Sequence, residues 1–162
     1  MTVLSTTPDP ETRTLTVVAE LAAPPSRVWQ LWADPRQLER WWGPPTWPAS
    51  FVEHHLAPGG GSRYFMTGPD GEKAHGWWRF LRVDEPRSLE LEDGFADENG
   101  TPAAELPTTR MRMDLEEVDA GTRMTLTSRF VSLEQMQQLM NMGMIEGLTE
   151  ALGQIDELLV AA

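Results

Sequence analysis

Two adjacent histidines, His54 and His55, are the residues of this sequence best suited by type to acid–base or metal chemistry. Neighbouring side chains of a strand point to opposite faces, so the pair cannot bind one metal ion without a distortion. If Leu56 faces the interior, His54 and Val52 do so too, and His54 is placed to act as a general base or as a hydrogen-bond donor to a ligand. A structural histidine with satisfied ring nitrogens is the alternative interpretation. The third histidine, His75, lies beside a turn and is expected to be exposed.

Other catalytic patterns are absent from the sequence. It has no HExxH or GxSxG motif, and without cysteine it has no thiolate ligand and no disulfide. Residues 59–61, three glycines, lack the Lys-Ser/Thr and the helix of a phosphate loop and so predict a turn. Acidic residues such as Glu53 and Asp93 are expected to form surface ion pairs with Arg110 or Arg112. We therefore predict no catalytic residue, no metal and no cofactor.

The charge balance argues against several classes of partner. The 162 residues include thirteen basic and twenty-five acidic side chains, a formal charge of -12, which repels nucleic acid and anionic lipid. No apolar run is long enough to cross a membrane, and residues 1–11 lack the basic start and apolar core of a signal peptide. We expect a cytoplasmic protein that binds no nucleic acid and does not insert into a membrane. Residues 1–11 are expected to form a disordered tail and residues 12–162 a single domain.

The elements that must position any site follow from periodicity and turn signals. Apolar residues alternate with polar ones in the strand segments, and Pro and Gly separate these segments. Short helices are expected at 28–32 and 38–42, each broken by proline or glycine. The expected strands are 12–21, 51–56, 63–67, 75–83, 89–95, 109–117 and 124–130.

A long amphipathic helix is expected from Ser132 to Ala162. Ser132 and Gln135 form a capping box at its start. Apolar residues then follow at spacings of three and four, with flexible methionines and glycines in the N-terminal half. Leucine and isoleucine follow from Leu148 to Leu159, which favours ordinary core packing there. This order predicts an α+β fold in which a curved antiparallel sheet of about six to seven strands grips the C-terminal helix, with two short helices after the first strand.

Several short motifs, in this order, resemble those of the START-like (SRPBCC, helix-grip) superfamily. They include Ala23-Pro24, Asp34-Pro35, Trp41-Trp42-Gly43-Pro44, Leu56-Ala57-Pro58-Gly59-Gly60 and Gly121-Thr122-Arg123-Met124. The resemblance is to the branch similar to activators of the 90-kDa heat-shock chaperone ATPase. The sequence departs from the common pattern at His55, at Leu148 and in a long loop over 96–107. Because these departures alter the pocket or the surface, a relative's ligand should not be carried over.

The resemblance implies a cavity between sheet and helix, and strand parity supplies candidate ligand-binding residues for it. The expected ligand is a small apolar molecule, lipid-like or aromatic. The candidates are Trp41, His54, Tyr64, Met66, Trp78, Phe95, Met113, Met136, Met140 and Met144.

Three functions follow as alternatives. The first is binding without catalysis. The second is an enzyme, because some START-like relatives are cyclases, dehydratases or hydrolases, and His54 would then be the acid–base group of this chain. The third is a protein-interaction module that regulates a chaperone ATPase. Ile145 or Leu152, if exposed on the helix, could support a homodimer, or both could pack on the short helices.

Overall fold

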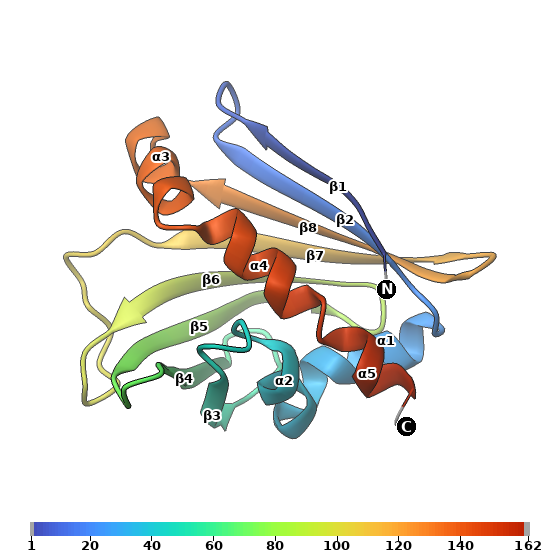
Figure 1. Ribbon diagram of the computed structural model, residues 1–162, viewed down its shortest axis with the longest axis horizontal. Coiled ribbons are helices and arrows are strands. Elements are labelled where there is room, and N and C mark those ends of the chain that lie inside the picture. Colours follow the sequence, from blue (N-terminus) through green and yellow to red (C-terminus); the bar gives the residue numbers. More distant parts are fainter. Residues whose placement is uncertain (1, 161–162) are drawn as a thin grey trace.

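The computed structural model describes residues 2–160 as one curved antiparallel sheet with helices across one face (Figure 1). The strand order is β1-β2-β8-β7-β6-β5-β4-β3, so the predicted α+β fold with an antiparallel sheet is confirmed. These residues form eight strands, slightly more than predicted. The strands are β1 (Thr2–Asp9), β2 (Thr14–Leu21), β3 (Ala49–His54), β4 (Gly61–Thr67), β5 (Lys73–Asp84), β6 (Ser88–Ala96), β7 (Thr109–Val118) and β8 (Gly121–Phe130).

The extra strand is β1, in the segment for which a disordered tail was predicted. Residues 2–9 pair antiparallel with residues 14–20 of β2, with a bulge near Ser5. The carboxylate of Asp9 accepts a hydrogen bond from the backbone N–H of Glu11 at 3.0 Å, which fixes the turn into β2. Threonine and valine favour strands, and pairing with β2 satisfies their backbone groups. The prediction was wrong for residues 2–9, and residue 1 of that tail lies outside the described residues.

Two short helices follow β2 and fill one end of the concave face. They are α1 (Pro25–Ala33) and α2 (Pro35–Trp41), each with proline in its first turn. The side chain of Asp34 caps α2 by accepting a hydrogen bond from the N–H of Arg36 at 2.9 Å. Both helices turn their aromatic and leucine side chains into the core.

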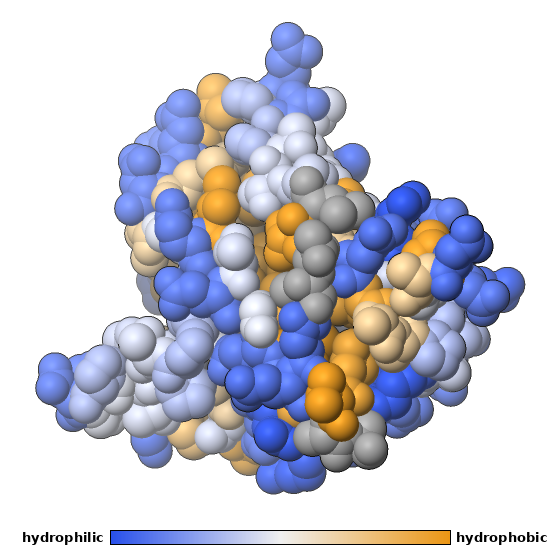
Figure 2. Space-filling view, turned by 45° about the vertical axis from the view of Figure 1, so that its right-hand side comes forward, coloured by the Kyte–Doolittle hydropathy of each residue, from blue (hydrophilic) through white to orange (hydrophobic). Residues whose placement is uncertain are grey.

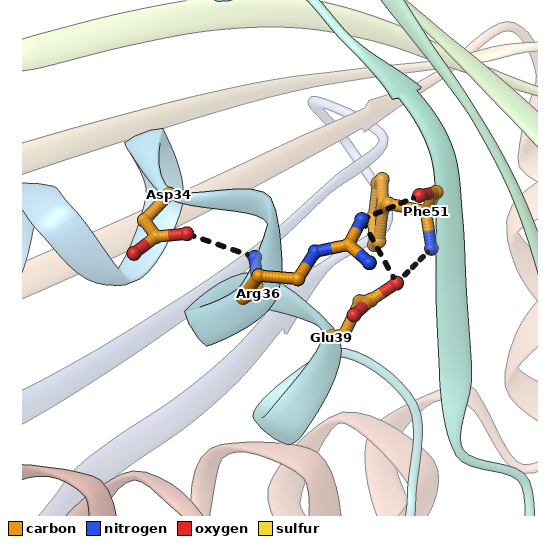
Figure 3. Close-up of polar contacts among 4 residues, drawn as sticks. All are labelled: Asp34, Arg36, Glu39 and Phe51. Atoms are coloured by element: carbon orange, nitrogen blue, oxygen red, sulfur yellow. Dashed lines mark hydrogen bonds and ion pairs between the residues drawn. The ribbon is translucent and has the colours of Figure 1, made fainter.

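Side chains of α2 also satisfy the backbone of β3, which is an edge strand (Figure 3). The Arg36 guanidinium donates to the carbonyl oxygen of Phe51 at 2.9 Å, and the Glu39 carboxylate accepts from the backbone N–H of Phe51 at 2.7 Å. The two side chains are also ion-paired at 3.4 Å. An unpaired edge is a template for further strand pairing, so these contacts protect it.

The C-terminal segment begins as predicted but is not one continuous helix. Ser132 Oγ accepts from the N–H of Gln135 at 3.0 Å, and Gln135 Oε1 accepts from the N–H of Val131 at 2.7 Å. The helix then breaks at Gly143, whose φ of 90° lies in the left-handed region, and it breaks again at Gly153. The segments are α3 (Leu133–Asn141), α4 (Met144–Leu152) and α5 (Ile155–Val160), and residues 161–162 lie outside the described part.

These three segments cross the sheet diagonally in Figure 1, and α5 ends beside α1. At that end Leu152, Ile155 and Leu158 are buried, which agrees with the expected core packing of this half. Because Leu152 is fully buried, it cannot form the exposed dimer contact considered above. Within residues 2–160, no helix is long and apolar enough to span a membrane.

Candidate functional site

A cavity of about 300 Å³ lies between the sheet and the helical segments α3 and α4. Its wall comes from strands β4 to β8, from α3 and α4, and from the loop that follows α2. The lining is mostly apolar, and its polar side chains are Tyr64, His75, Asp93, Thr109 and Ser128. A hollow of this size with few polar groups is typical of sites for small molecules.

The helix leaves this space open because two of its residues carry little or no side chain there. At Gly147 of α4, which lines the cavity, an added Cβ would meet nothing within 4 Å. Ala151 lies one turn further along the same wall. Met144 and Leu139 reach the cavity from either side of the break at Gly143. The roof of the cavity therefore comes from both halves of the predicted helix, because Leu148 and Ala151, expected to pack in the core, line it together with Leu139, Met144 and Gly147.

The polar centre of the wall is a hydrogen bond between Tyr64 of β4 and Asp93 of β6. The Tyr64 hydroxyl donates to Asp93 Oδ1 at 3.0 Å. Strand β5 lies between these two strands, and Gly76 makes the crossing feasible. A Cβ built on Gly76 would lie only 2.5 Å from the ring carbon and the hydroxyl of Tyr64. The missing side chain at position 76 thus lets the phenol ring lie across β5.

The pKa values of both Tyr64 and Asp93 are raised in the folded protein. Burial raises the pKa of Asp93 from 3.8 to about 7, although the hydrogen bond from Tyr64 opposes the rise. Burial also raises the pKa of the Tyr64 phenol well above its ordinary value, and the charge of Asp93 adds to this. The carboxyl group can therefore change its charge near neutral pH, whereas the phenol stays protonated.

The indoles of Trp42 and Trp78 surround the pair. Trp42 lies edge-on to Trp78 with ring centroids 4.9 Å apart, and Trp78 lies 5.9 Å from the Tyr64 ring. Both indoles lower the pKa of Tyr64, and Trp78 also lowers that of Asp93. Neither indole Nε1–H forms a hydrogen bond with a partner among residues 2–160. The two indoles therefore lower these pKa values as nearby N–H dipoles.

Four of the ten predicted ligand-binding residues line the cavity, namely Tyr64, Met66, Phe95 and Met144. Contact with a ligand stays a prediction for these four. The other six lie outside the lining, for reasons that differ between the helices and the sheet.

Trp41 and Trp78 belong to the aromatic core. Trp41 is fully buried in α2, and its Nε1–H donates to the carbonyl oxygen of Leu31 at 2.9 Å. Its neighbour Trp42 follows the end of α2 in an extended conformation and lines the cavity in its place. Trp78 lies behind the wall in contact with Trp42, Phe51 and Tyr64.

The predicted ligand-binding methionines Met113, Met136 and Met140 lie outside the cavity wall, and neighbouring residues take their places. Met113 is fully buried, and Met111, two residues earlier on the same face of β7, lines the cavity. Met136 is buried in the core and Met140 packs against it, while Leu139 reaches the cavity from α3. The prediction assumed one unbroken helical stripe. The break at Gly143 means that α3 and α4 do not share one face.

His54 faces inward as parity predicted, but it lies under α1 and away from the cavity. Its Nδ1 contacts Ser62 Oγ at 2.7 Å and its Nε2 contacts the carbonyl oxygen of Trp32 at 2.8 Å. Since a carbonyl only accepts, Nε2 carries the proton, and both ring nitrogens are satisfied. Burial lowers the pKa of His54, which favours this neutral form. The structural interpretation is therefore correct, and the enzyme hypothesis loses its proposed acid–base group.

Other residues of the histidine region also differ from expectation. A bulge between Phe51 and Glu53 breaks the alternation of β3, so Val52 is 69% exposed instead of buried. His75, expected to be exposed, is half-buried and lines the cavity. No three His, Asp or Glu side chains within the described residues are grouped to hold a metal ion.

Asp93 is the most important residue that sequence reasoning missed. It was expected on the surface beside Arg110 or Arg112, but it faces the cavity. A signal was available, because Leu89, Leu91 and Asp93 alternate along β6 and therefore share its inward face. A carboxylate in line with two buried leucines is the pattern of an inward-facing polar group.

Comparisons with known proteins agree on this fold. The family model described as Activator of Hsp90 ATPase homolog 1-like protein matches residues 22–160. A solution NMR structure of an Arthrobacter aurescens protein is 52% identical with a TM-score of 0.94, and the match covers 99% of this chain and 94% of that one. A crystal structure of a Mycobacterium smegmatis protein is 50% identical with a TM-score of 0.91 and 99% coverage of both chains.

A more distant crystal structure, from Nitrosomonas europaea, is 28% identical with a TM-score of 0.80. That match covers 93% of this chain and 96% of the other. No curated protein matches the chain.

Proposed function

Because the chain belongs to the Activator of Hsp90 ATPase homolog 1-like family of the START-like, helix-grip superfamily, we propose that it binds a small, largely apolar molecule in the cavity under α3 and α4. The family supports a ligand-binding or regulatory domain in general. The proposed site is the cavity lined by strands β4 to β8 and by α3 and α4.

The observation that carries the proposal is the open space opposite Gly147. Protein interiors are normally filled to the density of organic crystals. Here about 300 Å³ lies between an apolar sheet face and a helix whose central cavity residue has no side chain. A ligand that removes this apolar surface from water is stabilised in the cavity by about 25 cal/mol for each Å² that becomes buried.

The lining also suits an adaptable fit. Met66, Met111 and Met144 contribute flexible thioether side chains, while Trp42 and Phe95 contribute flat aromatic surface. Such a lining suits an apolar ligand that is either lipid-like or aromatic. Regulation of a chaperone ATPase stays a prediction that the family resemblance alone supports.

The proposal can be tested by filling the cavity. Substitution Gly147→Phe places a ring where a Cβ meets no neighbour, and we expect it to weaken binding of naphthylmethanol at least tenfold. Thr149→Phe is the matched control, because Thr149 is exposed on the same helix. Binding is measured by quenching of tryptophan fluorescence, and Gly147→Leu serves as a milder variant with an intermediate loss.

Two results would contradict the proposal. One is equal binding by the wild type and both Gly147 variants, which would place the probe outside the cavity. The other is the absence of binding by the wild type for a panel of apolar and aromatic compounds of this size.

A further inference from the structure

The cavity holds one carboxylate in an otherwise largely apolar wall, and this carboxylate has acceptor capacity to spare. Asp93 Oδ1 accepts the hydrogen bond from Tyr64, and Asp93 is part of the lining. An ionised carboxylate offers about four lone-pair sites, so the hydrogen bond from Tyr64 and the nearby Trp78 indole and Gly94 backbone N–H still leave a site free for a ligand.

The charges around Asp93 offer no cationic partner in the protein. The ionisable groups that face it are Tyr64 of β4 and His75 of β5. From β7, β8, α3 and α4 the wall contributes only uncharged side chains, and no Lys or Arg is among the described lining residues. An ionised carboxylate in such a setting is costly unless a positive charge compensates it.

Aromatic surface surrounds the same point. Trp42, Tyr64 and Phe95 all line the cavity near Asp93, and Phe95 is two residues away on the same face of β6. The faces of aromatic rings attract cations, most strongly when the site is shielded from water. A carboxylate bordered by aromatic rings is a recognition site for a positively charged nitrogen.

The field of the whole protein acts in the same direction. The formal charge is -12, and the face shown in Figure 2 is largely hydrophilic, with groups of hydrophobic residues between the hydrophilic ones. Such a field raises the local concentration of cations and repels anions. An apolar carboxylic acid or phosphate would meet repulsion both at the surface and at Asp93.

We infer that the ligand is an amphiphilic amine, with an apolar body in the cavity and a protonated amino group bound to Asp93. This inference rests on the proposed function, since it names the chemical class of the ligand for that site. The ammonium donates hydrogen bonds to the free lone pairs of the carboxylate and lies against the aromatic rings. The hydrogen bond from the Tyr64 hydroxyl holds the carboxylate in place.

The inference predicts how binding responds to pH. Because burial raises the pKa of Asp93 to about 7, the free protein holds a neutral carboxyl group at pH 6 and a carboxylate at pH 8. The ammonium requires the carboxylate, so its affinity should rise about tenfold from pH 6 to pH 8. A neutral ligand that accepts a hydrogen bond from the protonated carboxyl group would show the opposite trend.

The test compares two probes of the same shape, naphthylmethylamine and naphthylmethanol, by titration calorimetry at pH 6 and pH 8. We expect the wild type to prefer the amine at pH 8 by tenfold or more. Asp93→Asn should remove this preference and its pH dependence while it keeps the alcohol affinity within threefold. Asp114→Asn is the matched control, since Asp114 lies on the outer face of β7 paired with Arg112.

Two further variants assign the effect. His75→Gln removes another ionisable side chain of the wall and leaves Tyr64 and Asp93. Because the Tyr64 phenol stays protonated, any pH dependence that remains in this variant belongs to Asp93. Tyr64→Phe should weaken amine binding less than Asp93→Asn, because the carboxylate stays in place. At pH 6, amine binding should release protons in the wild type, measured in buffers of different ionisation enthalpy, and release none in Asp93→Asn.

The outcomes separate the two proposals. If the alcohol binds as tightly as the amine at both pH values and Asp93→Asn changes nothing, the amine inference is wrong and cavity binding stands. Tighter alcohol binding at pH 6 than at pH 8 would assign a neutral acceptor ligand instead. If the wild type binds neither probe nor any compound of the apolar panel, or if Gly147→Phe binds the alcohol as tightly as the wild type, the proposed function itself fails.

Discussion

The two ends of the C-terminal helical region pack against the rest of the molecule in opposite ways. Helix α5 packs against α2, and its residues Ile155 and Leu158 belong to the same buried core as Trp32 and Trp41, with almost no surface exposed. Beneath α3 and α4, half-buried Met144 and the bare backbone of Gly147 face a cavity.

This difference shows that the helix sequence decides where the fold is solid and where it is hollow. Branched and leucine side chains fill the space at one end, whereas glycine and methionine leave it open at the other. The break at Gly143 separates α3 from α4, so that Leu139 and Met144 both reach the hollow. A space of this kind weakens packing, so its presence favours a function for the hollow end.

The largest expected effect comes from truncating one side chain at each end. Ile155→Ala should lower the free energy of unfolding by about 2–5 kcal/mol, because Ile155 is fully buried. Met144→Ala should lower it by about 1 kcal/mol, because the side chain already borders empty space. Urea unfolding of both variants measures the contrast, and equal losses would contradict the division into a solid and a hollow end.

The next effect concerns Asp93 at the hollow end. Its pKa is raised from 3.8 to about 7 by folding, so its stabilising contribution is complete below about pH 4 and is lost as pH rises through 7. The difference between 3.8 and about 7 corresponds to about 4 kcal/mol at most. Relative to the wild type, Asp93→Asn should therefore gain stability from pH 4 to pH 8. Urea unfolding along this series, with Asp114→Asn as control, would contradict the burial of Asp93 if the two variants behaved alike.

A third prediction compares two glycines of the cavity. Gly76→Ala should destabilise the protein by about 1–3 kcal/mol, because the new methyl group collides with the Tyr64 ring. Gly147→Ala should instead stabilise it by about 1 kcal/mol through helix propensity, since the methyl group meets nothing. Thermal unfolding gives the signs, and a loss of stability in both variants would show that the space at Gly147 is occupied.

The smallest effect concerns the roof of the hollow end. Ser132→Ala removes the side-chain cap of α3 and should cost about 1 kcal/mol. We expect faster amide hydrogen exchange in α3 and unchanged exchange in α5, because the cap acts only on the first helix. Faster exchange in both segments would mean that the three segments open as one unit.

Much of the fold could be predicted from the sequence, because alternation and turn residues mark strands and helices locally. The capping pair Ser132 and Gln135 and the inward faces of β4 and β7 were found in this way. The edge strand β1 was missed because its pairing with β2 is a tertiary contact that overrides a weak local signal. The break at Gly143 was missed because the apolar spacing continues through it.

The candidate site was harder to predict, since it depends on which of two neighbouring residues faces a space. Trp42 lines the cavity in place of Trp41, and Met111 in place of Met113, because helix ends and strand depth decide these positions. Asp93 was assigned to ion pairs by its charge, although its alternation with Leu91 pointed inward. Type of residue is local information, whereas the position of a void is set by the whole fold.

The most direct test of the account is NMR of the methionine methyl groups during titration with naphthylmethanol. The neutral probe makes this test independent of the amine inference. We predict that the signals of Met66, Met111 and Met144 shift, while those of the packed Met113 and Met124 stay in place. The shifts should vanish in Gly147→Phe. Unchanged signals for the three cavity methionines, or a shift confined to the exposed Met142, would contradict binding in the cavity.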